Sequence, residues 1–132
     1  MARPQDWPQR LVRFVGSRRA MPFAWGANDC AAFAFAWVRE VRPGAQMPCA
    51  TWTSEREALE RLAALGGIAG AASAVLGDPV PAMFAQRGDV VAQLIDGRIT
   101  LGVVTGSSLV GPGHNGVVAV RVDRRGALAW RV

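Results

Sequence analysis

The sequence contains no lysine and no tyrosine, and its 132 residues include only one histidine and two cysteines. All fifteen basic residues are therefore arginines, which we attribute to genome composition because lysine codons are rich in A and T. Two cysteines and one histidine do not make a zinc site without further ligands close in space. We therefore expect no metal and no cofactor. The two cysteines and the one histidine are also the few thiol and imidazole side chains that could act as a catalytic nucleophile or base.

Charged residues are also scarce, at 19% of the chain against 51% hydrophobic residues, which excludes a disordered protein. The net charge of +5 could attract nucleic acid, a phosphate-rich envelope or an acidic protein. However, the arginines are scattered, and no window interleaves basic and aromatic residues as a single-strand binder does. We therefore expect a solvated basic surface and no specific nucleic-acid binding.

Long hydrophobic runs are missing as well. Glycine or arginine interrupts each apolar stretch before it reaches the ~20 residues that span a bilayer. The first seven residues lack the apolar core of a signal peptide. We expect a single domain over residues 1–132, with no membrane span, made in the cytoplasm without a signal peptide.

Apolar periodicity predicts helices in the first part of the chain. They are expected over residues 6–19, 29–41, 54–65 and 68–76. The first is amphipathic, whereas the second is a continuous apolar run that should be buried. At the start of the third, Ser54 can cap the helix and Glu57 can reach back, which is the pattern of a capping box.

After Pro81 the hydrophobic period changes to that of strands, with Asp96 and Gly97 as a hairpin turn. The expected strands are residues 89–95, 99–105, 108–110, 117–122 and 127–132. Helices followed by a meander of antiparallel strands indicate an α+β fold, helical over about 1–78 and β over about 79–132. The second helix should pack centrally on the sheet, with a shared core of Phe33, Trp37, Val91 and Val103.

Two short motifs have structural explanations. Residues 87–89, Arg-Gly-Asp, match the tripeptide that integrins bind, but they open a strand. Residues 111–116 fit the dinucleotide pattern G-x-G-x-x-G, but no helix follows, so we expect a loop. The five tryptophans are candidates for the core or for contacts with other subunits, and Trp7 and Trp130 are the candidates for exposed docking residues.

Cys30 is the most informative residue, because it stands directly before the apolar helix. Unpaired N–H groups and the helix dipole at this position favour the thiolate, which is the nucleophilic form of cysteine. Asp29 is best explained as the helix N-cap and less well as a catalytic group. Cys49 is explained as a small loop residue, and we expect both thiols to be free.

Three segments resemble NlpC-type papain-like cysteine peptidases. Residues 23–30, F-x-W-G-x-x-D-C, resemble the nucleophile segment, and residues 87–91, R-G-D-V-V, resemble the P-G-D-[LV]-V strand that enters the β-subdomain. Residues 101–106, L-G-V-V-T-G, resemble the strand H-V-G-I-Y-x-G. The chain more closely resembles a compact NlpC-like phage and prophage family, whose members share the first helix, the cysteine segment and a C-terminal A-W-R-V, here residues 129–132. The resemblance implies a papain-like fold, with N-terminal helices on a small antiparallel sheet or barrel. It also implies that the gene lies among tail-tip and baseplate genes.

The sequence departs from these peptidases at the catalytic base. In the active relatives a histidine opens the H-V-G-I-Y strand, but the aligned position here is Thr100, or Leu101 with a one-residue slip, and neither takes a proton near neutral pH. The polar residue that orients that histidine would fall near Gly111 and is also missing. The only histidine, His114, follows in the next loop, and would serve only if that loop folded back. We expect no imidazole within reach of Cys30.

Two functions follow from the resemblance. The first is a component of a phage or phage-like tail tip or baseplate, bound to other tail-tip or baseplate proteins in the particle, with a degenerate catalytic site. The second is an active amidase or peptidase that cleaves peptidoglycan stem peptides as DNA enters the bacterium. Cys30 would be its nucleophile and His114, or a partner chain, would supply the base, with Trp25, Gly26 and Thr100 along the substrate cleft. We favour the first, because two absent partners weigh more than one retained cysteine.

Overall fold

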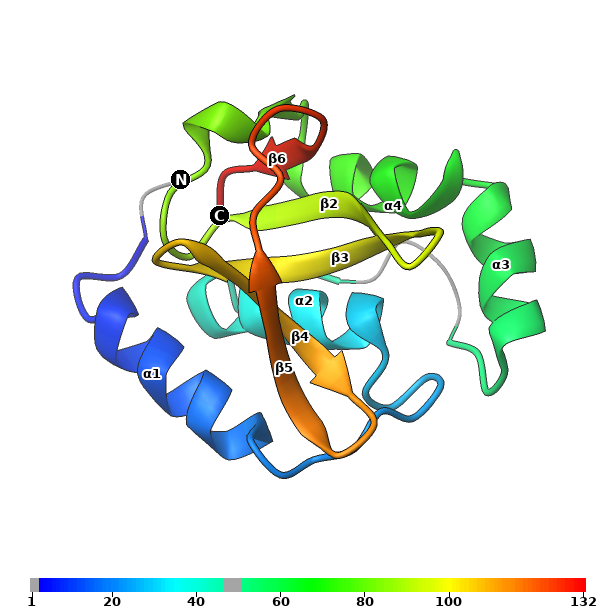
Figure 1. Ribbon diagram of the computed structural model, residues 1–132, viewed down its shortest axis with the longest axis horizontal. Coiled ribbons are helices and arrows are strands. Elements are labelled where there is room, and N and C mark those ends of the chain that lie inside the picture. The colour runs from blue at the N-terminus through cyan, green and yellow to red at the C-terminus, as the bar shows by residue number, and fades with distance from the viewer. Residues whose placement is uncertain (1–2, 47–50) are drawn as a thin grey trace.

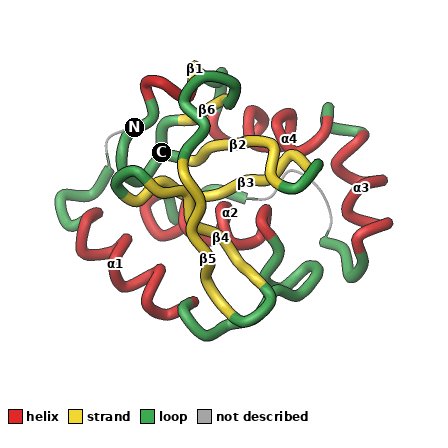
Figure 2. Tube along the Cα trace, viewed as in Figure 1, coloured by secondary structure: helices red, strands yellow, loops and turns green. Residues whose placement is uncertain are grey.

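The computed structural model describes residues 3–46 and 51–132, and over these residues it is an α+β fold with four α-helices and a six-stranded antiparallel sheet. The helices are α1 (Trp7–Arg18), α2 (Cys30–Val41), α3 (Glu55–Ala63) and α4 (Gly67–Leu76), with a short 3-10 helix at Ala82–Phe84. The strands are β1 (Val80–Pro81), β2 (Val90–Ile95), β3 (Arg98–Thr105), β4 (Ser108–Gly113), β5 (Gly116–Arg121) and β6 (Leu128–Trp130). Their order in the sheet is β1-β6-β2-β3-β4-β5, and Figure 2 shows the strands crossing the molecule between the helices.

The central helix is α2, which packs against β3 and lies behind the sheet in the view of Figure 1. It starts where the sequence predicts, because the Asp29 carboxylate accepts a 2.8 Å hydrogen bond from the N–H of Ala32. Phe33, Trp37 and Val103 are fully buried in the shared core. The prediction of a buried helix packed on an antiparallel sheet is thus confirmed.

One predicted core residue, Val91, faces the opposite side of the sheet. Val90 pairs with Val103 in the core beside α2, whereas Val91 packs into a second cluster with Val104. Neighbouring residues of a strand point to opposite faces, so the predicted phase of β2 was wrong by one residue. The reason is that β2 is buried on both faces at this end, which removes the polar alternation that would mark its phase.

The predicted loop at residues 111–116 is instead the end of a hairpin. β4 continues to Gly113 and β5 begins at Gly116, which leaves only His114 and Asn115 in the turn. The glycines of this segment suggested a loop. At Gly116, however, close packing explains why the residue is glycine. A Cβ on Gly116 would lie 2.1 Å from the carbonyl oxygen of Arg19.

Trp130 is not a docking residue. It is 0% exposed, and its indole N–H donates a 3.1 Å hydrogen bond to Oγ of Ser73. The prediction of an exposed side chain failed because β6 lies inside the sheet, between β1 and β2, although it is close to the end of the sequence. Trp7 is partly exposed, with the guanidinium of Arg3 stacked 4.4 Å from its ring centre.

The Arg-Gly-Asp tripeptide has the predicted structural role. Asp89 is buried and forms an ion pair with Arg3, whose Nε also donates a 2.6 Å hydrogen bond to the carbonyl of Val132. These contacts hold the beginning and the end of the described chain against the start of β2, and Figure 1 shows the two ends close together. A buried carboxylate in an ion pair is not available to a receptor.

The pair α3 and α4 covers one end of the sheet. Ser54 caps α3 by accepting a hydrogen bond from the N–H of Glu57, as predicted. The Glu57 carboxylate reaches back to accept from the Ser54 hydroxyl at 3.5 Å and, at the shorter distance of 2.8 Å, from the Thr53 hydroxyl. Over the described residues no single helix meets the length and apolarity needed to cross a membrane. The α3–α4 pair, bent by 63°, meets them jointly by length and composition alone.

Candidate functional site

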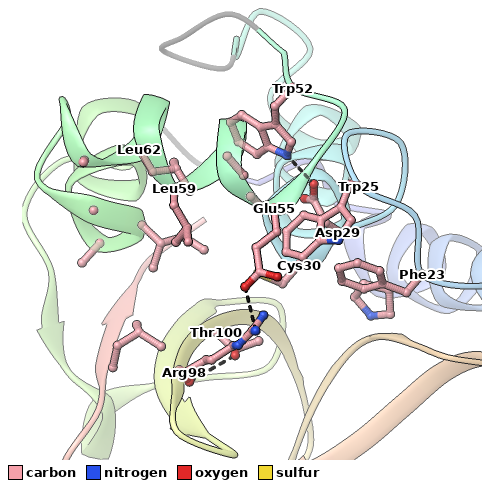
Figure 3. Close-up of a pocket in the computed structure, with 18 of the residues that line it drawn as sticks. Phe23, Trp25, Asp29, Cys30, Trp52, Glu55, Leu59, Leu62, Arg98 and Thr100 are labelled. Carbon is pink, nitrogen blue, oxygen red and sulfur yellow. Dashed lines mark hydrogen bonds and ion pairs between the residues drawn. The ribbon is translucent and has the colours of Figure 1, made fainter.

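A cleft of about 630 Å³ lies between the start of α2, the α3–α4 pair and the β2–β3 hairpin (Figure 3). Apolar side chains form most of its wall. They include Phe23, Trp25, Trp52, Leu59, Leu62 and Ile99. Cys30 reaches the cleft from the first turn of α2, so the residue that the sequence singles out does lie in a concave site.

The environment of Cys30 favours the neutral thiol. Burial raises the pKa of Cys30 above its ordinary value, and the nearby charge of Asp29 raises it further, although the backbone N–H of Leu101 acts in the opposite direction. The sequence predicts a thiolate stabilised by the helix N-terminus. The structure differs because the loss of solvent around the sulfur outweighs that stabilisation.

Asp29 is occupied by three structural hydrogen bonds. In addition to Ala32, it accepts from the N–H of Gly26 at 2.8 Å and from the indole N–H of Trp52 at 2.6 Å. The carboxylate is also buried. Through these three bonds it holds the loop before α2 and the segment before α3 against the start of α2. This is the capping role that the sequence predicts for it.

Gly26 and Trp25 shape the turn that leads to α2. Gly26 has φ +80°, and a Cβ there would lie 1.9 Å from the carbonyl oxygen of Trp52, so only glycine fits. Gly26 does not line the cleft, whereas Trp25 does, stacked edge-on against Phe23 with ring centres 4.8 Å apart. Of these two predicted substrate contacts, the structure brings only Trp25 to the cleft.

Leu101, rather than Thr100, faces α2. Leu101 is buried in the cluster against which Cys30 packs. Thr100 pairs with Gln93, whose side chain bonds to the backbone of Arg121 and Asp123 on the other face of the sheet. Thr100 contributes to the cleft wall, but its hydroxyl donates a 3.3 Å hydrogen bond to the carbonyl of Arg98.

His114 is not part of the cleft wall, although Pro112 of the same hairpin is. It sits in the β4–β5 turn, where its side chain is exposed, and it is not one of the lining residues. Gly111, where an orienting polar residue would fall, is a β4 residue and brings no side chain. Cys49 falls among residues 47–50, outside the described part of the chain.

The ion pair at the cleft mouth was not predicted from the sequence. Nη2 of Arg98, at the start of β3, lies 2.6 Å from Oε1 of Glu55, at the start of α3, and Figure 3 shows the pair between the two walls. Local sequence patterns cannot reveal a contact between residues that are 43 positions apart.

Leu59 is a cleft residue that the sequence could have revealed. It lies off the buried Ala58–Leu62 stripe of α3, and an apolar residue outside such a stripe is a detectable signal.

The polar side chains of the cleft thus already have partners within the protein. Asp29 accepts three hydrogen bonds, Glu55 pairs with Arg98, and Thr100 donates to a backbone carbonyl. Nowhere in the described ranges do three His, Cys, Asp or Glu side chains come close enough to hold a metal ion. The site offers one half-buried thiol and a largely apolar surface.

Fold and site together define an α+β domain with a cysteine at the start of a buried helix, in an apolar cleft. The chain belongs to a family described as a domain of unknown function (DUF6950), whose model matches residues 2–132. The comparison with curated proteins gives no match. The function therefore has to be argued from the site.

Proposed function

We propose that this protein is a papain-like, NlpC-type domain with a degenerate catalytic site, which works as a component of a phage or phage-like tail tip or baseplate. The observation that carries the proposal is that Leu101 faces the helix of Cys30. Thr100, or Leu101 with a one-residue slip, is the position that aligns with the base of the resembling peptidases, and neither residue can act as that base. A cysteine opening a buried helix that packs on an antiparallel sheet is also the arrangement that the resemblance implies.

The chemistry of the cleft supports loss of hydrolysis. Amide cleavage by cysteine needs a thiolate and an acid that protonates the leaving amine. Burial raises the pKa of Cys30, and Leu101 can neither take nor give a proton. Asp29 is held in three hydrogen bonds, and His114 is exposed in a turn outside the cleft wall.

One observation favours the second candidate, an active cysteine amidase. Cys30 is only partly buried and opens to a cleft, so a base from a partner chain would have access to it. Such an enzyme would cleave peptidoglycan stem peptides, with the thiol as nucleophile. The two candidates differ in whether Cys30 is needed for turnover.

The deciding experiment compares wild type, Cys30→Ala and Cys49→Ala. It measures the cleavage of muropeptides by each purified protein and the assembly of particles that contain it. We expect no turnover by any of them and normal particle yield and DNA delivery for both variants. Removal of one buried sulfur costs on the order of 1 kcal/mol, which a domain of this size tolerates. Muropeptide cleavage by wild type and Cys49→Ala alone, with DNA delivery lost in assembled Cys30→Ala particles, would establish the enzyme instead.

A docking face should include Trp7, which is the partly exposed tryptophan outside the cleft in the described chain. Arg87 lies 5.8 Å from its ring centre, and tryptophan and arginine together are typical of interface hot spots. Arg87→Ala should reduce incorporation into particles without unfolding the protein. Arg56→Ala, an equally simple change on the exposed side of α3, is the control that should leave incorporation unchanged.

A further inference from the structure

Two large aliphatic side chains are exposed at the cleft, in addition to its buried apolar wall. Leu59 of α3 is 62% exposed and Ile99 of β3 is 54% exposed, and both line the same concavity. Exposed aliphatic residues gathered at a concave site mark a binding surface. The volume of about 630 Å³ also lies within the ~300–1,000 Å³ typical of small-molecule sites.

The wall suits an alkyl chain better than a peptide. A stem peptide carries amides and carboxylates, which lose their water on binding and need partners in the site. The carboxylate of Asp29 and the hydroxyl of Thr100 are already bonded within the protein. An alkyl chain needs no polar partner and gains from burial against such a surface.

The mouth of the cleft supplies one cation. Among the described residues that line the cleft, Arg98 is the only basic one. Its side chain is 64% exposed and forms an ion pair with that of Glu55, which is 39% exposed. Exposed pairs of this kind are weak, so an anionic head group can take the place of Glu55 at small cost. The net charge of +5 also favours an anionic ligand over a cationic one.

We propose that this cleft binds a single-chain anionic amphiphile, with the alkyl chain between Leu59 and Ile99 and the carboxylate or phosphate head at Arg98. The proposal rests on the proposed function only in treating Cys30 as a non-catalytic part of the wall. No covalent step is involved, and binding needs neither a particle nor a partner chain.

The first measurement is quenching of tryptophan fluorescence by 11-bromoundecanoate, because Trp25 and Trp52 both line the cleft. We expect saturable quenching, with competition by unbrominated carboxylates used below their micelle concentrations. Across octanoate, decanoate and dodecanoate, affinity should rise by up to about threefold to fourfold per buried methylene. Dodecyl phosphate should compete like dodecanoate, which tests whether the head-group chemistry is shared.

Matched variants separate the chain from the head group. Leu59→Glu should abolish binding, whereas Val12→Glu, on an equally exposed position of α1 (62%), should leave it unchanged. Arg98→Gln should weaken carboxylate binding by about twofold to fivefold. Glu55→Gln should strengthen it, because Arg98 then has no internal competitor, and neither change should alter binding of 1-undecanol.

Several outcomes would overturn the proposal. These are absence of quenching, equal loss of binding in Leu59→Glu and Val12→Glu, and alkylammonium binding as tight as that of the carboxylate. Binding of a capped apolar peptide without any binding of alkyl carboxylates would identify a peptide groove instead. None of these results bears on muropeptide turnover or particle assembly, so failure of this proposal and failure of the proposed function are distinguishable.

Discussion

The indole N–H of Trp52 donates a 2.6 Å hydrogen bond to Oδ2 of Asp29, the carboxylate that caps the helix of Cys30. Both side chains are buried, and they are separated by 22 intervening residues. The bond therefore fixes the segment before α3 over the start of α2. The position of the cleft wall at Trp52 therefore depends on Asp29, which also caps α2, the helix that forms the wall at Cys30.

Trp52→Phe should destabilise the protein by about 1–3 kcal/mol, because the ring is largely kept while a buried charged acceptor loses its donor. Asp29→Ala should cost more, since it also removes a helix cap worth about 0.5–2 kcal/mol and strands the N–H of Gly26. Urea denaturation measures both. Trp25→Phe, in the same cleft but partly exposed, is the control and should lose less than ~1 kcal/mol. Equal losses for the two tryptophans would refute the role given to the hydrogen bond.

Gly26→Ala should be strongly destabilising, by about 2–4 kcal/mol, because the position combines φ +80° with a 1.9 Å approach of the new Cβ to the Trp52 carbonyl. Gly16→Ala provides the opposite case. Gly16 is within α1, and its Cβ would meet nothing within 4 Å, so alanine should stabilise by up to ~1 kcal/mol. Thermal unfolding of the two variants compares them directly, and a neutral Gly26→Ala would show that the turn can relax.

The local parts of this structure could be predicted from the sequence because their signals are local. Asp29 before an apolar run predicts both the cap and the buried helix, and Asp96-Gly97 between apolar strands predicts the hairpin. At Asp96 and Gly97 the backbone has φ of +50° and +80°, the conformation that these residue types tolerate. Within the site, the same reasoning places Cys30 at the first turn of the buried helix.

The remaining features depend on partners far away in the sequence. Trp52 meets Asp29, and Arg98 meets Glu55, only after the helices have packed on the sheet. The inward position of Trp130 follows from strand order, which no pattern in residues 127–132 reveals. The charge state of Cys30 was mispredicted for a related reason, since the helix N-terminus is visible in the sequence but the burial of the sulfur is not.

The raised pKa of Cys30 predicts a loss of stability at alkaline pH. A thiol whose pKa is higher in the folded state binds its proton more tightly there, so its contribution is complete below the unfolded value of about 8.5. That contribution is lost as the pH rises through the folded pKa. The absence of lysine and tyrosine makes this range unusually free of other titrations.

The measurement compares the free energy of unfolding against pH for Cys49→Ala and for the double variant Cys30→Ala/Cys49→Ala. We expect the first to lose stability above pH ~8.5 relative to the second. Iodoacetamide should also alkylate Cys30 in native Cys49→Ala more slowly than it alkylates free cysteine at pH 7.5. An activated nucleophile with a lowered pKa would give the opposite slope and faster alkylation, which would contradict the proposed loss of catalysis.

If the proposed function is right, Leu101→His should supply part of the chemistry that the resembling peptidases obtain from their histidine. The backbone of Leu101 already lies against the sulfur, and its side chain packs in the cluster beside Cys30. An imidazolium there would lower the pKa of Cys30, and each unit of that change raises the thiolate fraction near neutral pH by about tenfold. The variant should lose about 2–4 kcal/mol of stability, because a polar ring replaces a buried leucine.

Thr100→His is the matched control, since residue 100 pairs with Gln93 on the other face of the sheet. Alkylation of Cys30 should accelerate in Leu101→His alone, with a pH profile that inflects near the histidine pKa of ~6.5. Equal acceleration in both variants would show that a nearby positive charge suffices and that position 101 is not special. Acceleration in Thr100→His alone would mean that residue 100, and not Leu101, corresponds to the position of the base in the resembling peptidases.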